Sequence, residues 1–488
     1  MQRRQSSETI VGGIAIGGSN PIRVQSMTTT NTNDTEACVL QAKRIIEAGG
    51  ELVRLTTQGV REAENMRNIS AVLKAEGIRT PLVADVHFNA RVADVAALYC
   101  EKVRINPGNY VDPARTFKKL EYTDAEYAAE LQKIEQRFVP FLNICREHHT
   151  AIRIGVNHGS LSDRIMSRYG DTPAGIVESC MEFLRICQRE QFQDVVISIK
   201  ASNTVVMVQS VRLLVEAMDR EQMHYPLHLG VTEAGEGEDG RIKSAVGIGA
   251  LLTEGIGDTI RVSLSEEPEC EIPVARKLVS FIDECAAIRE TARIEDGTLY
   301  LSFHETSYED LQLKAAMAAG AILIDGRARN LVIENTPHVI GNREEVIEDM
   351  HSKHETDSGN LLLPITSSLL PDLADSILQA ARVRFTKPEY ISCPGCGRTL
   401  YNLQDTIARI KAAVSREAET DPRFRTLKIG IMGCIVNGPG EMADADFGYV
   451  GAGPGRVSLY RAKECVQKNI PEANAVEKLI EFIKETLA

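Results

Sequence analysis

The sequence predicts an α/β protein made of a (β/α)8 barrel, an inserted α/β domain and a smaller C-terminal α/β domain. Between residues 20 and 265, short β-branched runs alternate with helical stretches, which is typical of a parallel α/β sheet. Eight such units in about 250 residues match a closed TIM barrel better than an open sheet. A doubly wound sheet stays open as an alternative, because the pattern alone does not show whether the sheet closes.

The barrel prediction covers residues 1–285. Between the first two predicted strands, the segment 34–50 has an acidic start, apolar residues at helical spacing and a Gly–Gly stop, and it therefore predicts one β/α unit. The eight predicted strands are 22–27, 52–57, 81–88, 102–108, 151–157, 195–202, 226–235 and 258–265.

The segment 286–385 reads as a separate inserted domain, which we interpret as a spacer. It contains a predicted strand (298–304), a predicted helix (308–320) and a predicted strand pair with a turn (321–335), followed by an amphipathic stretch. Four histidines of this segment have no regular ligand spacing, and we expect them to be solvated or packed rather than bound to metal. They are His304, His338, His351 and His354.

The segment 386–488 predicts a small α/β domain. After a cysteine-rich turn, we expect a helix at 405–419, a strand at 427–432, a Gly/Pro-rich loop at 433–455 and an amphipathic helix at 475–488.

Charge and composition narrow the classes of function. The net charge of −13 argues against nucleic acid or an anionic membrane as a general partner, so an anionic ligand needs a local basic pocket. The N-terminus has no apolar segment of a secretory signal, and no stretch approaches the ~20 apolar residues that cross a bilayer. We therefore expect the eleven cysteines to be thiols in a reducing compartment.

Three cysteines stand out from the others by their spacing. Cys393 and Cys396 supply two thiols from one turn, and Cys434 follows a strand that can bring it back alongside. This is a usual way to hold an iron–sulfur cluster. A structural zinc site, which would want a fourth Cys or His, and a redox dithiol, which would leave Cys434 without a role, are the alternatives. The other cysteines, expected in the core or on the surface, are Cys38, Cys100, Cys145, Cys180, Cys187, Cys270, Cys285 and Cys465.

The loop around the third cysteine also contains Glu441, seven residues after Cys434. This carboxylate could complete the coordination of a fourth iron as an oxygen ligand. An oxygen ligand is more easily displaced from iron than a thiolate ligand. The alternative is a surface turn with an incidental glutamate.

Basic residues gather at the ends of the predicted barrel strands, where barrel active sites form. Several arginines and lysines together would hold a diphosphate, although each alone could equally form a salt bridge. Glu233, at the mouth of the seventh strand, could be a general acid under a closing loop, or else a helix cap or part of a solvated acidic loop. The polar set at the strand ends comprises Arg54, Arg104, Arg153, Asn157, Lys200, Arg261 and Ser263.

Several segments resemble the 4-hydroxy-3-methylbut-2-enyl diphosphate synthase family, most specifically CPGCGRT and GCIVNGPGE, with IRVQSMTTTNTND, VRINPGN and LHLGVTEAGEGEDGRIKSAVGIG in the barrel. The resemblance covers about 1–285 and 386–488 and implies reductive ring opening and dehydroxylation of 2-C-methyl-D-erythritol 2,4-cyclodiphosphate. It implies a [4Fe–4S] cluster at Cys393, Cys396, Cys434 and Glu441. The family's diphosphate contacts fall on Arg54, Arg104, Arg153, Asn157, Lys200, Arg261 and Ser263, and Glu233 falls on its acid.

The resemblance also implies a ferredoxin or flavodoxin as electron donor. Because the sequence shows no transit peptide, we expect a bacterial cytoplasm, or a plastid stroma if such a peptide has been removed. Around GEGEDG and EMADADFGYV the chain is similar to the longer, plant-like form of the family, in which a large barrel-like insert separates the two domains. At about 100 residues, the segment 286–385 would be a shortened insert. In the short form the cluster domain closes on the barrel of a partner in a homodimer, whereas in the long form it can close within one chain. The sequence leaves both arrangements open. It also leaves open a phosphate-binding barrel with a structural zinc module, and a pterin-binding transferase.

Overall fold

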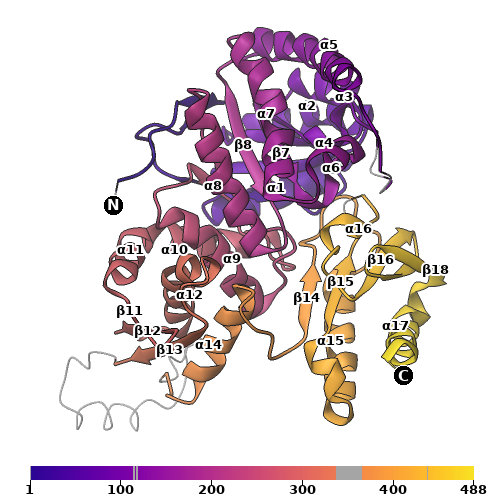
Figure 1. Cartoon of the computed structure of the whole chain (residues 1–488). Coiled ribbons are helices and arrows are strands. Elements are labelled where there is room, and N and C mark those ends of the chain that lie inside the picture. The colour runs from indigo at the N-terminus through magenta and orange to yellow at the C-terminus, as the bar shows by residue number, and fades with distance from the viewer. Residues whose placement is uncertain (1, 114–115, 117–118, 337–364, 437, 488) are drawn as a thin grey trace.

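The computed structural model describes residues 2–113, 116, 119–336, 365–436 and 438–487 (Figure 1). His338, His351 and His354 lie outside the described residues. His304 is exposed, and its Nδ1 donates a hydrogen bond to the carbonyl oxygen of Thr336 at 2.8 Å. No helix in the described part of the chain is long and apolar enough to cross a membrane.

Residues 23–260 form a closed parallel barrel, which confirms the predicted fold class and excludes the doubly wound sheet. The strand order is β8-β7-β6-β5-β4-β3-β10-β9, and a parallel bridge between Ile197 and Leu227 joins the two outer strands. Each strand falls within one of the eight predicted runs. The strands are β3 (Arg23–Met27), β4 (Leu52–Thr57), β5 (Leu82–Val86), β6 (Lys102–Ile105), β7 (Ala151–Asn157), β8 (Val195–Lys200), β9 (His228–Leu229) and β10 (Thr259–Ile260).

Helices surround the barrel and bury the outward-facing side chains of its strands in one large hydrophobic core. The first helix begins as its sequence predicts, because the side chain of Asp34 accepts a hydrogen bond from the amide of Ala37 at 3.0 Å and so caps the helix. The main helices around the barrel are α1 (Thr35–Glu47), α2 (Val60–Ala75), α3 (Ala90–Ala97), α5 (Asp124–His148), α7 (Pro173–Arg189), α8 (Thr204–Arg220), α9 (Gly237–Leu252) and α10 (Glu271–Ser280).

The N-terminal end of the barrel is closed by a hairpin that the sequence pattern did not reveal. Strands β1 (Thr9–Val11) and β2 (Ile14–Ile16) pair antiparallel. Val11 and Ile16 pack against inward-facing Leu52, Val83 and other apolar side chains in a small separate core. Above this layer the barrel interior becomes polar, with Lys102, Arg104 and Arg153 buried toward the C-terminal ends of the strands.

The inserted segment packs on the outside of the barrel. Strands β12 (Thr298–Phe303) and β13 (Asn330–Asn335) pair in parallel and are connected by helix α12 (Tyr308–Ile324), which packs against α9 of the barrel. The expected strand pair at 321–335 is wrong in its first half, because residues 321–324 form the last turn of α12. This helix is buried on nearly all sides, so its apolar run carries no helical periodicity. The other elements are α11 (Ile282–Thr291), β11 (Arg293–Glu295) and α14 (Leu369–Ala380).

The C-terminal segment forms a five-stranded sheet with helices α15 (Leu403–Thr420) and α17 (Glu472–Leu487). The predicted helices and strand are confirmed. The second half of the expected loop is wrong, since residues 447–453 form a central strand whose small residues hid its pattern. In sheet order the strands are β14 (Glu389–Ser392), β15 (Lys428–Met432), β16 (Phe447–Gly453), β17 (Arg456–Arg461) and β18 (Glu464–Pro471).

Candidate functional site

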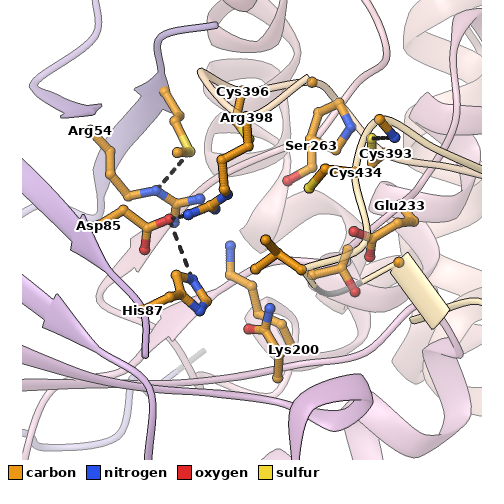
Figure 2. Close-up of a pocket in the computed structure, with 18 of the residues that line it drawn as sticks. Arg54, Asp85, His87, Lys200, Glu233, Ser263, Cys393, Cys396, Arg398 and Cys434 are labelled. Carbon is orange, nitrogen blue, oxygen red and sulfur yellow. Dashed lines mark hydrogen bonds and ion pairs between the residues drawn. The ribbon is translucent and has the colours of Figure 1, made fainter. Parts of the chain in front are cut away.

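A cavity of about 100 Å³ lies between the C-terminal face of the barrel and the C-terminal domain of the same chain (Figure 2). The two groups of residues that the sequence singled out meet here. The barrel contributes Arg54, Arg104, Arg153, Asn157, Lys200, Glu233, Arg261 and Ser263, and the C-terminal domain contributes Cys393, Cys396 and Cys434. Glu441 does not line the cavity. It adjoins the cavity through Thr232, a lining residue that donates a hydrogen bond to the Glu441 carboxylate.

The three cysteines come together because two parallel strands end at the same edge of the C-terminal sheet. Strands β14 and β15 are parallel neighbours. Cys393 follows the end of β14, and Cys434 lies two residues after the end of β15. The amide of Gly433 donates a hydrogen bond to the sulfur of Cys393 at 3.2 Å. Burial raises the pKa of Cys393 to about 12, so this thiolate needs a bound cation to be stable.

The barrel side of the cavity carries more cations than carboxylates. Arg261 is neutralised by two hydrogen bonds to Glu271, at 2.9 and 2.8 Å. Arg153 is 1% exposed, and its Nε and Nη1 atoms have no hydrogen-bond partner. Burial and the neighbouring cation Arg54 lower the pKa of both Arg153 and Lys200 well below their ordinary values. Such a group of buried cations is stabilised by an anion with several oxygens.

One carboxylate, Asp85, organises part of this group. It accepts a hydrogen bond from Nη1 of Arg104 at 2.9 Å. Burial alone would raise the pKa of Asp85, but Arg54 and Arg104 hold it well below its ordinary value. Burial and the charge of Arg104 lower the pKa of His87 to about 3, so this imidazole is neutral at pH 7 and its Nε2 accepts a hydrogen bond from Arg104.

Glu233 and Glu441 are buried beside each other where the two domains meet. Thr232 Oγ1 donates a hydrogen bond to Glu441 Oε2 at 3.0 Å, and the pKa of each carboxyl is raised, first by burial and for Glu441 also by the charge of Glu233. Glu233 has a φ of +51°, a conformation that costs energy for a non-glycine residue and is found preferentially at functional sites. The N-cap of α9 is Glu236 and not Glu233, so the helix-cap alternative is excluded.

Two serine side chains of the barrel and one short helix hold the C-terminal domain on the barrel. Ser202 Oγ donates to the carbonyl oxygen of Glu441 at 2.9 Å, and Ser265 Oγ donates to that of Cys393 at 2.9 Å. Short helix α16 (Gly438–Glu441) packs against the 3₁₀ turn η1 (His158–Ser160) after β7. The C-terminal domain is therefore in direct contact with the barrel of its own chain.

The inserted segment takes part in this closure through a buried ion-pair group. Glu389, the first residue of β14, accepts hydrogen bonds from Lys243 of α9 at 3.1 Å and from Arg382, just after α14, at 2.5 Å. Burial would raise the pKa of Glu389, but these two cations hold it below its ordinary value. Barrel, insert and C-terminal domain thus meet at one carboxylate.

Some residues of the site were missed by sequence reasoning. Arg398 and Met27 line the cavity, and Lys102 lies fully buried in the barrel interior two residues before Arg104. Arg398 follows the second cysteine of CPGCGR, so its position in that motif was an available signal. Lys102 could have been found from the two-residue period of the strand, which places it on the inward face with Arg104.

The fold and the site define a barrel protein with a basic pocket at its strand ends, closed by a domain that brings three cysteines to that pocket. The chain belongs to the GcpE family: the family's TIM-barrel domain matches residues 6–276, and the GcpE protein C-terminal domain matches residues 389–485.

Relatives named 4-hydroxy-3-methylbut-2-en-1-yl diphosphate synthase (flavodoxin) match nearly the whole chain. The protein from Bacteroides fragilis is 52% identical, with 99% of this chain and 96% of the relative covered. The proteins from Porphyromonas gingivalis and Protochlamydia amoebophila are 46% and 38% identical, with 99% of this chain and 98% and 96% of the relatives covered. The Bacteroides alignment spans 605 positions, more than the 488 residues of this chain, so that relative has residues that this chain lacks.

Proposed function

We propose that the chain is a 4-hydroxy-3-methylbut-2-en-1-yl diphosphate synthase, which opens the ring of 2-C-methyl-D-erythritol 2,4-cyclodiphosphate and removes a hydroxyl group reductively. The observation that carries the proposal is one cavity that has unpartnered buried cations on one wall and three cysteines on the other. The reaction consumes two electrons and two protons: the ring C–O bond to phosphate and one C–OH bond break, a C=C bond forms, and the oxygen of the hydroxyl group leaves as water.

We propose a [4Fe–4S] cluster as the cofactor, with Cys393, Cys396, Cys434 and Glu441 as its ligands. Three observations favour this fit: the sulfurs line one cavity, an amide donates a hydrogen bond to Cys393, and Glu441 Oε1 is buried without a hydrogen-bond partner. Among the described residues, no three His, Cys, Asp or Glu side chains converge enough to hold a single metal ion. Thiolates on separate irons of a cluster need not converge in that way. When bound, the cluster supplies the two electrons one at a time.

The chain's own side chains would bind and orient the diphosphate and move a proton. Arg153, whose Nε and Nη1 have no hydrogen-bond partner, and the buried Lys200 would bind the diphosphate oxygens, together with Arg54, Arg104, Arg261, Asn157 and Ser263. Glu233 would donate a proton to the leaving hydroxyl, because its raised pKa favours the protonated acid. The closed C-terminal domain would exclude water and so strengthen each of these interactions.

The same proposal extends to partners and domains. We propose flavodoxin as the electron donor, since the relatives' names specify it, with ferredoxin as the alternative that an assay must compare. We propose 1–285 as the substrate domain, 386–488 as the cluster domain and 286–385 as a spacer that also supplies Arg382 to the closure. A homodimer is compatible with closure inside each chain, and the reduced cysteines and the bacterial relatives favour a bacterial cytoplasm.

The test is anaerobic turnover of the cyclic diphosphate with reduced flavodoxin, and separately with reduced ferredoxin, followed by phosphorus NMR. The proposal expects the wild type to form a linear diphosphate as the reductant is consumed. The Cys434→Ser variant should form none, whereas the control Cys465→Ser, which changes a cysteine of β18, should form the product. Absence of product with both donors, although the protein binds the substrate, would contradict the proposal.

A further inference from the structure

The C-terminal domain contributes a cation of its own to the cavity. Arg398, two residues after Cys396, lines the cavity with an 8% exposed side chain, and its Nη2 lies 3.5 Å from Asp85 Oδ2 of the barrel. Figure 2 shows its guanidinium between Arg54 and Asp85 on one side and the cysteine loops on the other. Among the described cavity residues, Arg398 is the arginine that reaches the barrel mouth only when the two domains are closed.

The contact between Arg398 and Asp85 does not satisfy the guanidinium. A distance of 3.5 Å is longer than an ordinary charged hydrogen bond, and Nη1 of Arg398 is buried with no hydrogen-bond partner. Asp85 is already committed to Arg104 at 2.9 Å. One carboxylate therefore faces several arginines. Arg398 also interacts with the sulfur of Cys396, and its buried Nη1 stays available for another anion.

The anion that fits these donors is a diphosphate. A guanidinium presents parallel N–H groups that match two phosphate oxygens, and the nearest barrel cations already surround the same space. A diphosphate bound to the barrel cations would therefore also bind Arg398 of the C-terminal domain, on its opposite side.

We propose that Arg398 is a diphosphate-binding residue carried by the C-terminal domain, so that binding of the diphosphate and closure of that domain reinforce each other. This inference rests on the proposed function, because it assumes the diphosphate in the barrel mouth. It makes Asp85 the partner that holds Arg398 in place when the anion is absent. The ligand gains a contact available only in the closed state, and linkage requires that the ligand then favours closure.

The experiment uses the anaerobically purified, cluster-loaded chain with inorganic pyrophosphate as the probe. Affinity is measured by calorimetry and closure by small-angle scattering, for the wild type, Arg398→Gln and Arg398→Lys. The matched control is Arg409→Gln, an exposed arginine of α15 in the same domain whose only close carboxylate among the described residues is Asp405, at 3.9 Å.

Because Arg398→Gln removes one charged hydrogen-bonding group, we expect this variant to bind pyrophosphate about 10- to 100-fold more weakly than the wild type. Arg398→Lys should recover part of the loss, and Arg409→Gln should match the wild type. Pyrophosphate should compact the wild type but not Arg398→Gln, with equal iron contents. An Arg398→Gln protein that binds pyrophosphate within twofold of the wild type, at equal iron content, overturns the inference. If the wild type itself does not bind pyrophosphate, the anion pocket of the proposed function fails, and this inference with it.

Discussion

Gly159 of the barrel and Gly440 of the C-terminal domain lie backbone against backbone. A Cβ atom placed on Gly440 would lie 1.7 Å from the carbonyl oxygen of Gly159, and one placed on Gly159 would lie 2.4 Å from the amide nitrogen of Glu441. Glycine at position 440, which has no Cβ atom, therefore allows the backbones of the two domains to meet.

Gly440→Ala should prevent full closure, because the new methyl group meets backbone that cannot move aside. We expect turnover to fall at least 100-fold, an opening of the protein in small-angle scattering, and an unchanged iron content. The control is Gly453→Ala at the end of β16, where a Cβ meets no atom within 4 Å. Full turnover of Gly440→Ala would show that the closed arrangement is not needed for catalysis.

Glu233→Gln should remove the proton donor and retain the shape of the site. We expect kcat to fall about 10²- to 10⁴-fold, with little change in pyrophosphate affinity and none in iron content. Glu238→Gln, an exposed residue in the first turn of α9, serves as the control. A kcat within threefold of the wild type would assign the proton transfer to another group.

Glu389→Gln should weaken the junction of barrel, insert and C-terminal domain, because Lys243 and Arg382 would remain buried beside a neutral amide. We expect a loss of about 3 kcal/mol in the free energy of unfolding at pH 7. The pKa of Glu389 in the folded protein lies below its ordinary value of 4.5, so its stabilisation is present above that value and is lost as pH falls through the folded pKa.

Calorimetry of thermal unfolding at several pH values checks this prediction. The difference in midpoint between wild type and Glu389→Gln should be largest near neutral pH and shrink in acid. Glu481→Gln, which removes an exposed partner of Lys478, should change little. A difference that is constant with pH would mean that the charge of Glu389 does not stabilise the junction.

Lys102→Met should stabilise the protein in the absence of anions. Lys102 is fully buried, its Nζ has no hydrogen-bond partner, and burial, with Arg153 and Arg54, lowers its pKa well below the ordinary value. The amine of Lys102 binds a proton more strongly in the unfolded chain than in the folded chain. This lysine therefore lowers the free energy of unfolding most at low pH. The midpoint of Lys102→Met should exceed that of the wild type at pH 7, and the gain should shrink toward pH ~10. A lower midpoint would indicate a stabilising partner for Lys102.

The barrel was predictable because its signal is local. Each β-branched run forms a strand with its own periodic helix beside it, and parallel strands deliver the polar residues at their ends to one face. Arg54, Arg104, Arg153, Lys200 and Arg261 therefore came together as the sequence predicted.

What could not be predicted depends on contacts between distant segments. The strand-like run at 321–324 is helical because α12 is buried against α9, and the glycine-rich run at 447–453 is a strand because its neighbours β15 and β17 pair with it. The adjacency of Glu233 and Glu441 and the entry of Arg398 into the barrel mouth likewise arise only from domain closure.

The most direct test of the central claim is the content of iron and acid-labile sulfide per chain after anaerobic purification, in the wild type, Cys434→Ser and Cys465→Ser. The account predicts about four of each in the wild type and in Cys465→Ser, with a brown colour, and a substantial loss in Cys434→Ser. A colourless wild-type protein that contains one zinc ion and no labile sulfide would contradict it.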